Sequence, residues 1–199
     1  HLIYESGPTA TNSVFETVVC EGFSRFSLVD IQPGTSINNL TFKNLATNPT
    51  VYDTFGGVVI RSVDYEQSAN ITNVVFDGFS PDAVLGAESR FAAFNLFGPC
   101  AINGVSFKCS DASDTKVIDL FRTNYGLGSR GGYKVANVQA SGMPANSRLL
   151  SGDDGTLIVG GDFDKIRFEY GDGTAGTDAA VRFNGHYERF KFTNIDILG

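Results

Sequence analysis

One short phrase recurs along the chain: an apolar residue, two further residues, a second apolar residue, one polar residue and a third apolar residue. It is clearest in INNLTF, ITNVVF and INGVSF, which begin at Ile37, Ile71 and Ile102. The last two apolar positions alternate with the residue between them, which is the period of a strand with one buried face. The first apolar position comes three residues earlier and breaks that alternation. The phrase therefore predicts two short strand segments joined at a bend.

The phrase occurs six times, and start-to-start separations are 34, 31, 33, 28 and 24 residues. A further short apolar run precedes each copy, and no segment shows a sustained 3.6-residue period. A repeated unit of this size with short strands and no helix indicates one coil of a parallel β-solenoid, in which stacked coils share one core. The six aligned copies are Ile37/Leu40/Phe42, Ile71/Val74/Phe76, Ile102/Val105/Phe107, Val135/Val138/Ala140, Phe163/Ile166/Phe168 and Tyr187/Phe190/Phe192.

Asparagine gathers at the bend of the phrase. Asn39, Asn73 and Asn137 hold its third position, and Asn103 holds its second. Asn tolerates the left-handed backbone conformation, and its side chain hydrogen-bonds local backbone at turns. We interpret these residues as a structural column at one corner of the solenoid.

The resulting fold prediction is an all-β, right-handed single-stranded parallel β-helix of about six coils. It spans residues 13–199, with residues 1–12 as an N-terminal lead-in. The competing architecture is a β-sandwich or jelly roll, which predicts antiparallel strands joined by hairpin turns. The last residues still alternate like a strand, so we expect more chain or another subunit to continue the column. We also expect the chain to be a piece of a longer protein.

The phrase, the Asn-lined corner and the coil length resemble the parallel β-helix of the pectin-lyase-like superfamily. With 17 Phe and only three Cys, the chain is most similar to bacteriophage tailspikes and tail appendages. This resemblance implies a homotrimeric host-recognition module that binds bacterial surface polysaccharide, located on the virion tail or an extracellular surface. Two alternatives stay open: a polysaccharide lyase or glycoside hydrolase of the same fold, and a structural spacer in a fibre.

Charge and cysteine content narrow the class of protein. The net charge is −7 and the pI about 4.7, so we expect no binding to nucleic acid, whose phosphates this surface would repel. The sequence contains no run of 18 apolar residues, so we expect no membrane span. Cys20, Cys100 and Cys109 are far from His1 and His186, which argues against zinc. We expect buried free thiols and folding in the reducing host cytoplasm.

Asp153 and Asp154 are the candidate catalytic residues. Paired carboxylates can act as acid and base in glycoside cleavage. The resemblance adds that polygalacturonases use such a pair, and Gly185-His186 matches half of their histidine motif. Their Asn-Thr-Asp is missing here, and no Arg-x-Lys follows His186. The alternative interpretation is a tight polar turn between two apolar runs, and the sequence leaves open whether the protein is an enzyme.

A second set of candidates would contact a glycan. Aromatic rings stack on sugars, and Arg binds carboxylate or sulfate groups with its two-pronged guanidinium. These residues sit in or beside long excursions between strands, which we expect to be exposed. The candidates are Tyr125, Arg130, Tyr133, Tyr52, Glu88 and Arg90.

Four aspartates near the C-terminal end suggest oxygen ligands for a hard cation such as Ca²⁺. They are Asp162, Asp164, Asp172 and Asp178. Solvation of turns and loops explains them better, because only one imperfect copy of a glycine-rich calcium repeat is present. We therefore expect no cofactor and no metal site, with Ca²⁺ as the single alternative.

Overall fold

The computed structural model describes most of the chain. The described residues are 3–5, 9–16, 19–21, 27–32, 34–48, 55–60, 68–81, 90–110, 117–123, 131–152, 157–171 and 176–199.

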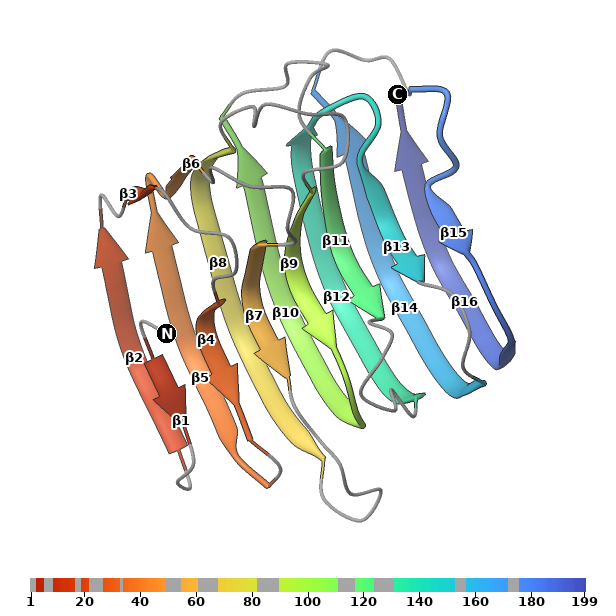
Figure 1. Cartoon of the computed structure of the whole chain (residues 1–199), viewed down its shortest axis with the longest axis horizontal. Coiled ribbons are helices and arrows are strands. Elements are labelled where there is room, and N and C mark those ends of the chain that lie inside the picture. The colour runs from red at the N-terminus through yellow and green to blue at the C-terminus, as the bar shows by residue number, and fades with distance from the viewer. Residues whose placement is uncertain are drawn as a thin grey trace.

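Two sheets run side by side along the long axis of the molecule (Figure 1). We call the first the short-strand sheet; in spatial order it contains β1 (Ile3–Glu5), β4 (Ser27–Ile31), β7 (Phe55–Ile60), β9 (Arg90–Leu96), β11 (Val117–Thr123), β13 (Arg148–Gly152) and β15 (Val181–Phe183). The second, the long-strand sheet, contains β2 (Thr9–Glu16), β5 (Ser36–Lys43), β8 (Ala69–Pro81), β10 (Cys100–Cys109), β12 (Gly131–Met143), β14 (Ile158–Tyr170) and β16 (Tyr187–Leu198). Two short strands, β3 (Val19–Glu21) and β6 (Ala46–Asn48), pair with each other, and β6 also pairs with the end of β8.

Every strand pairing in the described residues is parallel, and each strand pairs with its counterpart one coil away. Ile71 of β8 lies opposite Ile37 of β5 on one side and Ile102 of β10 on the other. A sandwich or jelly roll would need antiparallel pairs. The all-β parallel solenoid predicted from the repeat is therefore confirmed. No described helix is long and apolar enough to cross a membrane.

In the part of the chain that the structure describes, the solenoid contains seven successive pairs of short and long strands, one more than the six phrases predicted. The additional coil is the first: β1 and the start of β2 lie within the stretch 1–12 that was expected to be a lead-in. In β2, Ala10, Ser13 and Phe15 lie opposite the three apolar positions of β5. The repeat escaped detection here because its first two positions are small, and one of them is polar.

The last copy of the phrase was also aligned wrongly. Phe163 of β14 pairs with Phe192 of β16, and Ile166 pairs with Ile195. The sixth copy is therefore Phe192/Ile195/Ile197, not Tyr187/Phe190/Phe192. The error arose because β16 contains two overlapping strings of the same pattern. It also contains two left-handed residues, Arg189 and Asn194, with φ of 58° and 53°, so both strings bend.

The predicted Asn corner is confirmed for three of its four members. Asn39, Asn73 and Asn137 all have φ between 55° and 58°. Asn103 instead precedes Gly104, which takes the positive φ of 76°. The Asn73 amide donates to the side-chain oxygen of Asn39 at 3.0 Å, so a ladder of amides links neighbouring coils.

Inward-facing residues fill one continuous core along the column. Phe42 and Phe76 stack with ring centroids 5.1 Å apart, and Phe76 lies 5.2 Å from Phe107 in the next coil. All three rings are buried. Aromatic pairs at this separation add stability beyond the apolar area that they bury. Because each coil covers the apolar face of its neighbour, the stack holds together as one core.

Two of the three cysteines behave as expected. Cys100 and Cys109 of β10 are buried and form no disulfide, and the side chain of Cys20 lies outside the described residues. Burial raises the pKa of the Cys100 thiol to about 12, because an apolar environment disfavours the thiolate.

The left-handed corner at Asn137 predicts that two substitutions there will reduce stability to different extents. Its amide donates to Asn103 Oδ1 at 2.6 Å. Asn137→Ala loses this bond and forces an alanine into the left-handed region, so we expect destabilisation of about 1–3 kcal/mol. Asn137→Gly loses only the bond and should cost less than about half as much. Chemical denaturation followed by circular dichroism measures both; equal losses would contradict the corner's role.

The buried thiol gives a second prediction. At pH 8 the thiolate fraction of Cys100 should be roughly a thousandfold smaller in the folded protein than in the unfolded one, because its pKa is raised. Alkylation of Cys100, mapped by peptide mass spectrometry, should therefore be very slow in buffer and fast in denaturant. Because deprotonation is favoured in the unfolded chain, stability should fall as pH rises from about 9 toward 12. Native labelling at the unfolded rate would contradict this burial.

Candidate functional site: an axial groove on the outer face

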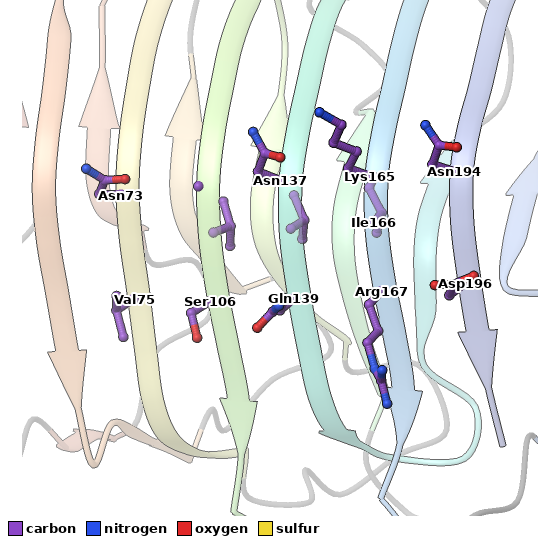
Figure 2. Close-up of a pocket in the computed structure, with 13 residues that line it drawn as sticks. Asn73, Val75, Ser106, Asn137, Gln139, Lys165, Ile166, Arg167, Asn194 and Asp196 are labelled. Carbon is purple, nitrogen blue, oxygen red and sulfur yellow. The ribbon is translucent and has the colours of Figure 1, made fainter.

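A groove runs along the solenoid axis on the outer face of the long-strand sheet (Figure 2). It crosses the five strands β8 to β16 and has a volume of about 660 Å³. We call it the axial groove. Its floor follows the corner of the coils, where the left-handed residue makes the sheet concave toward solvent. The groove is thus a direct product of the bend in the repeated phrase.

Two rows of outward-facing residues line the axial groove, one residue from each coil in each row. The corner row consists of Asn73, Gly104, Asn137, Lys165 and Asn194. The second row, two positions further along each strand, consists of Val75, Ser106, Gln139, Arg167 and Asp196, which are paired in this order across the sheet. Neighbouring strands lie about 4.8 Å apart, so each row spans roughly 19 Å.

The corner row is held in place by side-chain hydrogen bonds between coils. Asn137 and Asn194 donate to Asn103 Oδ1 and Asp164 Oδ1, at 2.6 and 2.9 Å. Lys165 also has a positive φ of 54°, which is rare for a residue that is neither Gly nor Asn. The corner amides therefore serve mainly to fix the floor of the groove.

The second row carries hydrogen-bonding and charged groups of several kinds. Ser106 and Gln139 offer a hydroxyl and an amide in the middle of the groove. Arg167 lies half-exposed beside Glu169, with Nη2 3.4 Å from Oε2. Exposed ion pairs of this kind contribute little to stability, so Arg167 is available to exchange Glu169 for a ligand. The charged groups Lys165, Arg167 and Asp196 all lie toward the C-terminal end.

A smaller hollow of about 280 Å³ continues the groove along the strands. It shares Ser106, Gln139 and Arg167 with the axial groove and adds Ser141 and Glu169. A ligand in the groove could therefore extend a branch or substituent past Arg167. Ser106, Gln139 and Ser141 can each donate and accept hydrogen bonds on this surface, which suits a ligand rich in hydroxyl groups.

A second polar cluster lies buried on the short-strand sheet. Arg148 of β13 is 1% exposed and forms ion pairs with Asp178 and, at 3.9 Å, with Asp119. Ser151 donates to Asp119 Oδ2 at 2.8 Å. The carboxylate that accepts from Ser151, Asp119, is also paired with the buried Arg148 guanidinium, so it is not a free base. The arrangement favours a structural role over nucleophilic catalysis.

Tyr170 ends β14 beside this cluster. Its hydroxyl donates to the Ser147 carbonyl at 3.1 Å. Burial first, and the charge of Asp178 second, raise the pKa of Tyr170, so the phenol stays protonated and keeps this bond at neutral pH.

Most residues predicted for catalysis or glycan contact lie outside the described residues. This holds for Asp153 and Asp154, and for Tyr125, Arg130, Tyr52 and Glu88. Arg90 begins β9, but its side chain is not described.

Tyr133 requires a correction, because it was expected to be exposed. It lies in β12, is 1% exposed, and its hydroxyl donates to the Leu96 carbonyl at 3.3 Å. The positive φ of Gly131 and Gly132 turns the chain just before it, so the strand begins earlier than expected and the ring faces the core. A buried ring offers no face to a sugar.

The aspartates considered for Ca²⁺ are spread over different surroundings. Asp164 accepts from Asn194, and Asp178 pairs with Arg148. Asp162 is exposed on β14, and Asp172 lies outside the described residues. Among the side chains that are described, no group of three His, Cys, Asp or Glu residues is arranged to hold a metal ion.

The groove residues were missed at the level of sequence, although the repeat contained them. Each second-row residue is the one between the last two apolar positions of its phrase, such as Ser106 between Val105 and Phe107. Period-two alternation makes that position face outward in every coil. Reading the phrase as columns of outward residues would have found the second row.

Comparisons with protein-family models, with curated proteins and with solved structures gave no match to this chain. The assignment of a function therefore depends on the geometry of the chain itself.

The buried cluster predicts that alanine substitution of two arginines will have very different effects on the free energy of unfolding. Arg148→Ala leaves Asp119 buried without its cation, so we expect a loss of about 3–5 kcal/mol in the free energy of unfolding. Arg167→Ala, on the exposed face, is the matched control and should change stability by less than about 0.5 kcal/mol. Denaturant titration of both variants measures this, and similar losses would contradict the structural role of Arg148.

Proposed function

We propose that this protein is a polysaccharide-binding module of the tailspike-like kind, and that the axial groove is where it binds. The observation that carries the proposal is the second row of the groove. From Ser106 to Asp196 it presents hydrogen-bonding side chains from four successive coils, at a spacing of about 4.8 Å. A linear polymer with repeated hydroxyl groups is the ligand that such a row fits.

The chemistry of the row supports a glycan over other linear polymers. Gln139 and Ser106 can each donate and accept, as sugar hydroxyls do. The net charge of −7 disfavours nucleic acid, and among the described residues that line the groove the cations are Lys165 and Arg167. The rigid strands on which these side chains stand keep the cost of ordering them low.

The more specific parts of the proposal come from the resemblance of the coil phrase to tailspikes. These are recognition of a host bacterium through its surface polysaccharide, a place on the virion tail or an extracellular surface, and assembly as a homotrimer. The fibre spacer is the opposing hypothesis. It needs the same rigid column but no ligand in the groove.

Binding should depend on the second row of the groove. We expect a panel of purified capsular and lipopolysaccharide-derived glycans, measured by isothermal titration calorimetry, to contain a ligand. Gln139→Ala and Arg167→Ala should each weaken its binding by about 5- to 30-fold, because each removes a polar contact worth about 1–2 kcal/mol. Lys134 is an exposed residue of β12 outside the groove. The variant Lys134→Ala is therefore the matched control and should bind the glycan with unchanged affinity.

If Gln139→Ala and Arg167→Ala both bind the glycan with unchanged affinity, the proposed site is wrong. If no glycan of the panel binds, the result favours the spacer. The same glycans should also be tested for release of reducing ends or unsaturated sugars. Turnover would establish the lyase or hydrolase alternative, and Asp153→Asn and Asp154→Asn are then the variants to make first. Binding without turnover would leave a recognition module.

A further inference from the structure

The smaller hollow beside the axial groove follows the strands, whereas the groove crosses them. Its lining comes from successive positions along β12 and β14, including Gln139 and Ser141 on the first and Arg167 and Glu169 on the second. The two cavities share Ser106, Gln139 and Arg167. A chain that fills the groove and a group that fills the hollow would therefore join at one place, as a side branch joins the main chain of a polymer.

A short side chain between two long ones explains why the surface is hollowed here. The outward position two residues beyond the second row is Lys108 in β10, Ser141 in β12 and Glu169 in β14. Lys108 lies opposite Ser141 in the sheet, so the serine leaves a gap beside its longer neighbours. Gly142 follows with a φ of 68°, and a Cβ there would lie 2.4 Å from the Cys109 carbonyl oxygen. Only glycine fits this close turn past β10.

The groups that line the hollow suit a neutral sugar. Ser141 and Gln139 can each donate and accept hydrogen bonds. The Arg167 guanidinium and the Glu169 carboxylate lie 3.4 Å apart, and their side chains are 55% and 45% exposed. This pair places donors beside an acceptor, which matches two neighbouring hydroxyl groups. A charged group fits less well, because Glu169 repels an anion and Arg167 repels a cation.

The volumes of the two cavities fit a polymer with a short branch. Sites for small molecules usually enclose about 300–1,000 Å³. The hollow, at about 280 Å³, lies at the lower end of this range and suits one sugar residue. The groove, at about 660 Å³, holds a longer stretch. Both cavities stand on strands of one sheet, so their relative position is fixed before a ligand binds.

We propose that the smaller hollow is a branch subsite, and that the ligand of the axial groove is a branched polysaccharide with a neutral side sugar in this hollow. The inference rests on the proposed function, because it assigns the main chain of the glycan to the groove. The branch point lies beside Gln139, where the cavities meet, and the side sugar lies over Ser141. Neighbouring hydroxyl groups of that sugar accept from Arg167 and donate to Glu169.

Removal of the branch tests the proposal from the side of the ligand. Each branched glycan of the panel is compared, by isothermal titration calorimetry, with the same polymer after enzymatic removal of its side sugars. The wild-type protein should bind the debranched polymer at least about tenfold more weakly, because several polar contacts are lost. Conversion of the side sugar to its uronic acid, which adds one carboxylate beside Glu169, should weaken binding by a similar factor.

Filling the hollow tests the proposal from the side of the protein. Ser141→Leu should weaken binding of the branched glycan at least about tenfold and leave the affinity for the debranched polymer unchanged. The unchanged affinity also shows that the variant is folded. Lys134→Leu places the same side chain at an exposed position of β12 outside both cavities. This control should bind both polymers as the wild type does.

Three results would overturn the branch subsite. They are equal wild-type affinity for the branched and debranched forms, an equal loss of both affinities in Ser141→Leu, and undiminished binding of the uronic acid form. In each case a glycan still binds in the groove, so the proposed function stands while this inference is wrong. If no glycan of the panel binds, both are wrong.

Discussion

The left-handed residue at the corner of each coil is the constraint on which the rest of the structure depends. Without it, a strand such as β8 would continue straight, and Ile71 and Val74 would point to opposite faces. The single positive φ at Asn73 restores both side chains to the core and bends the sheet. The same bend lies under the axial groove, and it places two consecutive outward residues, Thr72 and Asn73, at the corner of β8.

Stacking then turns a local bend into a long feature. Because equivalent residues lie opposite each other from coil to coil, the corner residues form a ladder and the outward residues form rows. Inward positions are restricted to apolar side chains by the shared core. Outward positions carry no such restriction, which is why the second row contains residues as different as Val75, Gln139, Arg167 and Asp196. The fold thus separates the residues that hold the column together from the residues that line the axial groove.

The sequence was sufficient to predict the repeat, the parallel solenoid and the corner, because all three depend on apolar periodicity and on the conformational tolerance of Asn. It was insufficient where small side chains weakened the pattern, and where two copies of the pattern overlapped. Ala10 and Ser13 hid the first coil, and the two overlapping strings of β16 shifted the last phrase by five residues. Tyr133 was assigned to an exposed loop because a Gly-rich stretch precedes it, although the strand begins at those glycines. The groove was not predicted, because the apolar positions of the phrase define the core and the second row lies at the polar positions between them.

The parallel rows have a consequence for how such a molecule can change. Each coil contributes one step to the core and one step to the groove, so the number of coils fixes the length of the groove. Gain or loss of a whole repeat would lengthen or shorten the groove by about 4.8 Å, without altering the contacts among the remaining coils.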